Sequence, residues 1–134
     1  MKLKLPALLF VFLLAGCPKA THPGTANKFD SDTYDTLLTA DSVIQSTKLD
    51  LSANKFPASI SGNVKTALNA LITAYDVAET FYCGAPAGNS CAADSYHALA
   101  VAGTASPQQS SQMQNLATNV TTATGQLAAA KGGK

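Results

Sequence analysis

The chain has 134 residues, enough for one small folded domain, with nine lysines, eight acidic residues and no arginine. Charged residues make up 13% of the chain, against about 25% in ordinary domains. The near-neutral charge argues against nucleic acid as a partner, because such binding needs a clustered basic surface.

The first 16 residues have the pattern of a secretory signal peptide. Lys2 and Lys4 give a positive start, and an apolar run follows from Leu5 to Ala15, interrupted only by Pro6. A membrane-spanning helix needs about 20 residues, whereas the core of a signal peptide has roughly 7–15. We therefore predict a signal peptide over 1–16 and no transmembrane helix there.

The apolar run ends in Leu14-Ala15-Gly16-Cys17, which resembles the lipobox of bacterial lipoproteins. The resemblance implies cleavage before Cys17 and a diacylglyceryl group on its thiol; the alternative is an ordinary secretory signal that contains a cysteine. Two acyl chains hold a protein stably at a membrane. Pro18 follows, where an aspartate is associated with inner-membrane retention, so the outer membrane is favoured if the source is diderm.

Residues 17–29 are interpreted as the lipidated cysteine and a flexible tether, and 30–134 as the folded domain. The stretch after Cys17 reads PKATHPGTANKF, whose two prolines, glycine and small polar residues leave little to bury. Its r.m.s. reach is about 20 Å. His22 lies within it, and we expect this side chain to be solvated.

Apolar residues in the domain recur with a helical period. The first helix is predicted to start near Ser31 or Asp32, with Asp30, Asp32 and Asp35 at its N-terminal end, and to stop at Asn54-Lys55. The second follows Pro57. Its apolar residues form the clearest stripe along one helix face in the chain: Ile60, Val64, Leu68, Leu71, Tyr75, Ala78 and Tyr82.

A Gly- and Pro-containing loop then runs from Cys83 to Cys91, and helical character returns from Ala92 to Gly103. Ser106-Pro107-Gln108-Gln109 is typical of a helix start with a capping box. The last stripe consists of Met113, Leu116, Val120, Ala123, Leu127 and Ala130. The fold class is therefore all-α: an antiparallel up-down-up three-helix bundle with a disulfide-closed bulge in or after helix two, or alternatively a four-helix bundle.

Cys83 and Cys91 are expected to pair with each other, since Cys17 is consumed by lipid and the exported compartment is oxidising. The alternative is a metal site of Cys83, Cys91 and His97 with Asp94 or Asp76, although this spacing matches no usual zinc pattern. We therefore assign no metal and no cofactor. A catalytic His97 would need a serine and an orienting acid beside it.

Asp76 and Glu79 are interpreted as a solvated helix face, and the acids near Asp30 as helix caps, because the spacing of a calcium loop is missing. We predict no catalytic residues. The expected function is a lipid-anchored helical envelope protein with a structural or accessory, non-enzymatic role. Its partners would be the membrane, through Cys17, and an envelope protein.

The alternative function is a binding module for a small molecule or a protein of the envelope, since helical bundles can hold ligands between helices. Four aromatic residues near the cysteine loop would line its pocket or form the end of the core: Tyr75, Phe81, Tyr82 and Tyr96.

Overall fold

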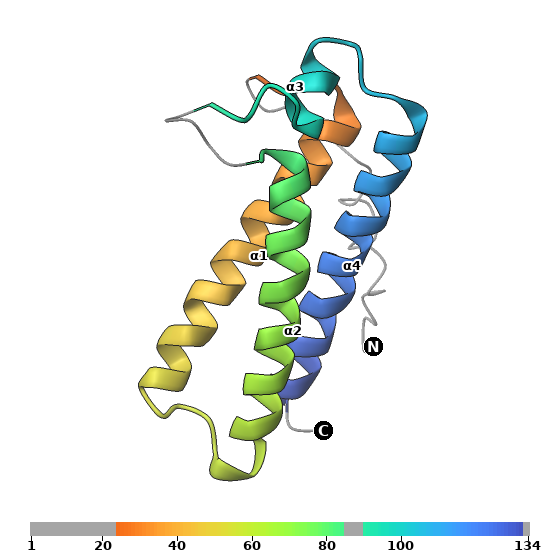
Figure 1. The fold of residues 1–134 in the computed structure, drawn as a ribbon. Helices are drawn as coiled ribbons and strands as arrows, with labels where there is room; N and C mark the ends of the chain where they lie inside the picture. Colours follow the sequence, from red (N-terminus) through yellow and green to blue (C-terminus); the bar gives the residue numbers. More distant parts are fainter. Residues whose placement is uncertain (1–23, 85–89, 133–134) are drawn as a thin grey trace, which may run out of the picture.

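Four helices packed together form the described part of the chain, which comprises residues 24–84 and 90–132 in a computed structural model. They are α1 (Lys28–Ser52), α2 (Ala58–Tyr82), α3 (Tyr96–Val101) and α4 (Pro107–Gly132). The long helices α1, α2 and α4 lie side by side with alternating direction, and the short α3 sits at one end (Figure 1). The all-α prediction is confirmed. The predicted leader, Cys17 and His22 lie outside the described residues.

The start of α1 is fixed by a reciprocal pair of side-chain caps. Asn27 accepts a hydrogen bond from the backbone N–H of Asp30 at 3.0 Å, and the Asp30 carboxylate accepts one from the N–H of Ala26 at 2.8 Å. These bonds satisfy backbone donors that a helix end leaves unpaired. As a result α1 begins at Lys28, three or four residues before the predicted start, and two residues of the predicted tether are helical.

The core lies between the three long helices and follows the predicted stripes. α2 and α4 supply most of it, and α1 adds three aliphatic residues. The buried members on the long helices are Leu37, Ala40, Ile44, Val64, Leu68, Leu71, Ala78, Tyr82, Met113, Val120, Ala123 and Leu127. Leu38, next to the buried Leu37 on α1, is 53% exposed. The burial pattern confirms that the helical periodicity of the sequence correctly predicts which faces of α2 and α4 are buried.

Two threonines are also buried on the inner face of α1. Thr33 donates its hydroxyl to the carbonyl of Phe29 at 2.9 Å, and Thr47 donates to that of Val43 at 2.7 Å. Bonding to the carbonyl one turn back allows a hydroxyl to enter an apolar core without losing its hydrogen bond. Among the described residues, no buried side-chain nitrogen or oxygen lacks a partner.

The expected disulfide joins Cys83, just past the end of α2, to Cys91. The two ends of the loop are also joined by a backbone hydrogen bond from the N–H of Ala92 to the carbonyl of Cys83 at 2.8 Å. Gly84 has a φ of 73°, the left-handed region that favours glycine. A Cβ there would lie 2.8 Å from the Cβ of Ala92, so glycine also permits the close approach.

The segment after the disulfide contains α3, which is separate from α2. Ser95 caps α3 by accepting from the N–H of Ala98 at 3.3 Å. The start of α4 is the predicted capping box: Ser106 accepts from the N–H of Gln109 at 3.2 Å, and the Gln109 side chain accepts from the N–H of Ser106 at 2.8 Å. None of the helices in the described ranges is both long and apolar enough to cross a bilayer.

Candidate functional site

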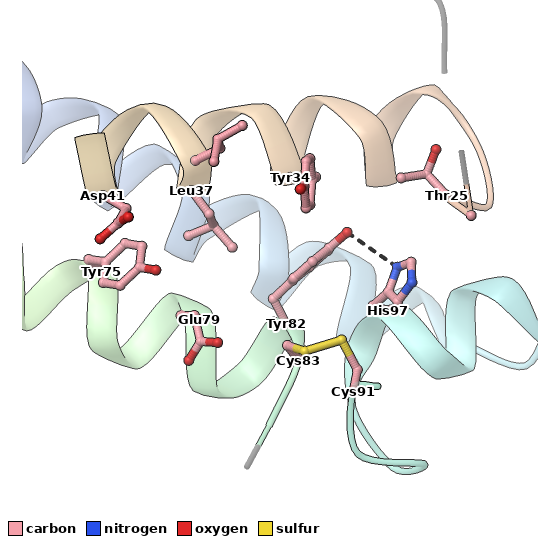
Figure 2. A pocket seen from close by; sticks show the side chains of 12 residues that line it. Thr25, Tyr34, Leu37, Asp41, Tyr75, Glu79, Tyr82, Cys83, Cys91 and His97 are labelled. Atoms are coloured by element: carbon pink, nitrogen blue, oxygen red, sulfur yellow. Dashed lines mark hydrogen bonds between the residues drawn. A yellow bond between two sulfur atoms is a disulfide. The ribbon is translucent and has the colours of Figure 1, made fainter. Parts of the chain in front are cut away.

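A cleft of about 550 Å³ opens between α1 and α2, close to the disulfide. Figure 2 shows Tyr34 and Leu37 of α1 pointing toward α2, and Tyr82 of α2 pointing toward α1. α1 contributes Tyr34, Leu37, Leu38 and Asp41; α2 contributes Tyr75, Glu79 and Tyr82; Gly24, Thr25, Cys83, Cys91 and His97 complete the lining at one end. This volume lies within the range of about 300–1,000 Å³ that is usual for small-molecule sites.

Two carboxylates line the cleft, Asp41 from α1 and Glu79 from α2, and both are partly buried. Asp41 accepts a hydrogen bond from the side-chain amide of Gln45 at 3.3 Å. Within the described residues neither carboxylate has an ion-pair partner. Burial raises the pKa of Tyr75, and Asp41, Glu79 and Asp76 raise it further through their negative charge. The cleft therefore carries a negative field over an aromatic wall.

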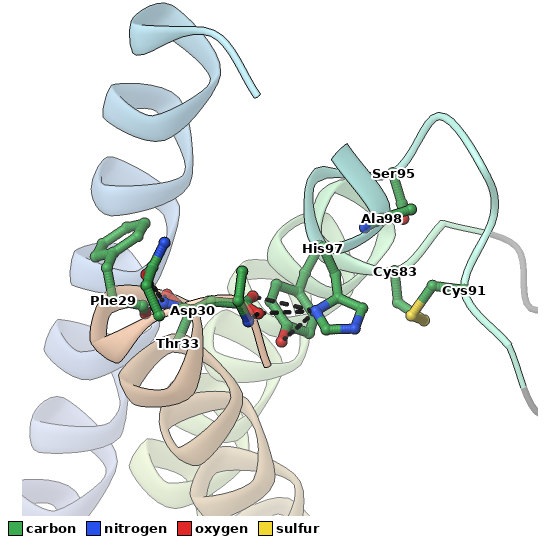
Figure 3. A network of polar contacts seen from close by, with 11 residues as sticks. Phe29, Asp30, Thr33, Cys83, Cys91, Ser95, His97 and Ala98 are labelled. Carbon is green, nitrogen blue, oxygen red and sulfur yellow. Dashed lines mark hydrogen bonds and ion pairs between the residues drawn. A yellow bond between two sulfur atoms is a disulfide. The ribbon is translucent and has the colours of Figure 1, made fainter. Parts of the chain in front are cut away.

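At the disulfide end of the cleft, a polar network connects three elements (Figure 3). Nδ1 of His97, on α3, lies 3.0 Å from Oδ2 and 3.2 Å from Oδ1 of Asp30, on α1. The hydroxyl of Tyr82, at the end of α2, lies 3.2 Å from the same Nδ1. Asp30 is fully buried, so these partners take the place of water as hydrogen-bond partners of its carboxylate.

The geometry determines where the protons of this network lie. An ionised carboxylate only accepts, so we assign the proton of the His97 ring to Nδ1, which donates to Asp30. The Tyr82 hydroxyl is hydrogen-bonded to the same Nδ1. Burial raises the pKa of Tyr82 strongly, and the negative charge of Asp30 adds to the effect. Tyr82 therefore remains a neutral hydroxyl next to the buried carboxylate.

The four aromatic residues of the cysteine-loop region divide between the cleft and the core. The Tyr96 ring is buried, with its centroid 6.0 Å from that of Phe29 and 6.2 Å from that of Phe81. Tyr82 contacts Tyr96 at 6.5 Å and also lines the cleft, whereas Tyr75 lines the cleft. Both interpretations made from the sequence therefore hold for part of the set.

The metal alternative fails because Cys83 and Cys91 are disulfide-bonded, so neither supplies a thiolate. Across the described ranges, no three His, Cys, Asp or Glu side chains are placed to hold a metal ion. His97 does have an orienting acid, Asp30, which the sequence did not indicate. Its hydrogen bonds in the described structure go to Asp30 and Tyr82 and to no serine.

Asp76 and Glu79 do not share one environment. Asp76 is exposed and lies on the side of α2 that carries Val77 and Phe81. Glu79 is partly buried and lines the cleft. The expected solvated face therefore describes Asp76, whereas Glu79 belongs to the candidate site together with Asp41.

Charge is separated along the bundle. In the described chain, seven of the eight acids and Lys28 lie in the part of the bundle that contains the cleft, namely the first part of α1, the second half of α2 and the segment before α3. The opposite end carries Lys48, Lys55, Lys65, Lys131 and Asp50. No family model, curated protein or solved structure matches this chain.

Proposed function

We propose that this protein is a lipid-anchored helical module of the bacterial envelope with a structural or accessory, non-enzymatic role. The observation that carries the proposal is the sequence Leu14-Ala15-Gly16-Cys17 directly after a charged start and a short apolar run. The buried bond from His97 to Asp30 supports a non-enzymatic role, because it gives the histidine a structural use. The outer membrane is the favoured location if the source is diderm.

Metabolic labelling with an alkyne fatty acid tests the anchor. We expect wild type to take up the label and Cys17→Ser to lose it. The matched control is the double variant Cys83→Ser/Cys91→Ser, which removes the other two cysteines of the chain and keeps the label. Unlabelled wild-type protein would contradict the proposal.

A second function, binding of a small molecule or an envelope protein, is favoured by the cleft between α1 and α2. Helical bundles commonly bind ligands between facing helices. Leu38, exposed at the cleft, offers a way to block it. Compounds that bind wild type in ligand-observed NMR and fail to bind Leu38→Trp would support this function. A broad screen without any such compound would contradict small-molecule binding.

We infer that the architecture is a three-helix bundle in which α3 closes one end, rather than a four-helix bundle. The length of α3 supports this, because six residues are too few to run alongside helices of 25 or 26. Hydrogen exchange tests the inference. Amides of α3 should exchange by local opening, earlier than those of the long helices. Equal protection in all four helices would favour the four-helix description.

A further inference from the structure

We propose that the cleft between α1 and α2 binds a small organic cation, meaning a protonated amine or quaternary ammonium ion with an apolar body. This inference rests on the binding function proposed second above. It specifies the charge of the ligand and the side chains that recognise it.

The charge follows from Asp41 and Glu79. They lie on opposite helices, line the same cleft, and have no ion-pair partner among the described residues. A neutral ligand would remove water from both carboxylates and offer no counter-charge. An anion would add repulsion. A cation between the two helices compensates both charges at once.

The shape of the cation follows from the rest of the lining. Tyr34, Tyr75 and Tyr82 present aromatic rings, and Leu37 and Leu38 present aliphatic surface. Aromatic faces attract ammonium groups through the ring quadrupole, and this attraction is the basis of quaternary-ammonium recognition. The aliphatic surface favours an apolar body on the ligand. A bare metal ion fits poorly, since the described residues contain no group of three metal-ligating side chains.

The charge distribution of the whole bundle favours the same class of ligand. Lys28, in the first turn of α1, forms an ion pair with Asp32 on the surface of that helix. The other described lysines lie toward the far end of the long helices. The cleft end therefore attracts cations before contact as well as on binding.

Isothermal titration calorimetry with the full chain in a non-ionic detergent tests the proposal. The probes are 4-phenylbutylamine, 4-phenylbutan-1-ol and 4-phenylbutyrate, which share one apolar body and differ in charge. We expect the amine to bind one-to-one and at least about tenfold more tightly than the alcohol, because a hydrogen bond to a charged group contributes that much. The acid should bind more weakly still.

The variants Glu79→Gln and Asp41→Asn should each weaken binding of the amine about tenfold and leave binding of the alcohol unchanged. Asp76→Asn is the matched control, because it removes one negative charge from the same helix outside the cleft; amine affinity should stay within about twofold. Equal binding of the three probes, or tighter binding of the acid, would overturn the cationic ligand and leave the binding function standing. Failure of all three to bind would also overturn the cationic ligand, and the compound screen described above would then decide whether the cleft binds any small molecule.

Discussion

His97 hydrogen-bonds to Asp30, a carboxylate 67 positions earlier in the chain, and the two atoms Nδ1 and Oδ2 lie 3.0 Å apart. The bond joins α3 to the first turn of α1, and the Tyr82 hydroxyl, at the end of α2, hydrogen-bonds to the same ring nitrogen of His97. Because Asp30 also accepts from the N–H of Ala26, one buried carboxylate holds together the end of the bundle at which the cleft opens.

Replacing Asp30 with asparagine should lower the free energy of unfolding by about 1–3 kcal/mol, as is usual when a buried polar group loses a hydrogen-bond partner. The amide keeps the size of the side chain but withdraws the charge that His97 and Tyr82 face. Urea unfolding followed by circular dichroism measures the loss.

Asp32→Asn is the control for this substitution. Asp32 is partly exposed and pairs with Lys28 one turn away on the surface of α1, an interaction worth at most about 1 kcal/mol. Equal losses for the two variants would show that the network at Asp30 has no special role in stability.

Tyr82 should make stability depend on pH in the alkaline range. Its folded-state pKa is raised above the ordinary value of 10.0. The contribution of the protonated Tyr82 hydroxyl to stability is therefore fully present below pH 10 and is lost as the pH rises beyond it. Tyr82→Phe should cost about 1 kcal/mol at neutral pH through the lost hydrogen bond.

Above pH 10 the free energy of unfolding of wild type should fall toward that of Tyr82→Phe, by up to about 1.4 kcal/mol per pH unit. Urea unfolding at pH 7, 9 and 11 measures it, and the two lower values should agree with each other. A difference that stays constant up to pH 11 would show that Tyr82 ionises in the folded state as it does in the unfolded chain.

The disulfide should stabilise the fold without being needed for it. Closing a loop of this length contributes about 2–3 kcal/mol in the chain-entropy model, so Cys83→Ala/Cys91→Ala should melt earlier and keep its helical circular-dichroism spectrum. A reductant should lower the melting temperature of wild type to the same extent and leave the double variant unchanged. Two free thiols in the mass spectrum of non-reduced protein would refute the pairing.

Gly84→Ala should destabilise the protein by about 1–2 kcal/mol, because the residue has a φ of 73° and its new Cβ would meet Ala92. Gly125→Ala, within α4 and with nothing within 4 Å of the added Cβ, should stabilise it by about 0.5–1 kcal/mol. Thermal unfolding of both variants gives the comparison. Shifts of the same sign would contradict it.

Local patterns in the sequence were sufficient for the existence of the helices, although α1 begins earlier and α3 is shorter than predicted. The stripes of α2 and α4 and the capping box at Ser106 and Gln109 all correspond to observed contacts. The earlier start of α1 also had a local signal: Asn27 and Asp30 stand three residues apart, which is the spacing of reciprocal capping. That signal was obscured by the prolines and glycine immediately before it.

The candidate site depends on relationships that no local pattern contains. Asp30 and His97 meet because α3 folds back across the bundle end, and their sequence separation gives no hint of the contact. Asp41 and Glu79 face one cleft only because of the register between α1 and α2. From the sequence, Glu79 could not be distinguished from Asp76, which lies one turn away on the same helix.

The position of Gly24 at the cleft has a consequence for where the cleft would encounter its ligand. Gly24 lines the cleft and stands seven residues after Cys17, a distance of at most about 25 Å of fully extended chain. With the lipid that we propose on Cys17, the cleft would remain within about that distance of the membrane surface. Amphipathic amines accumulate there, drawn by the apolar core and by anionic headgroups. The cleft would then respond to the concentration of such a molecule at the membrane surface, which can far exceed its concentration in the surrounding water.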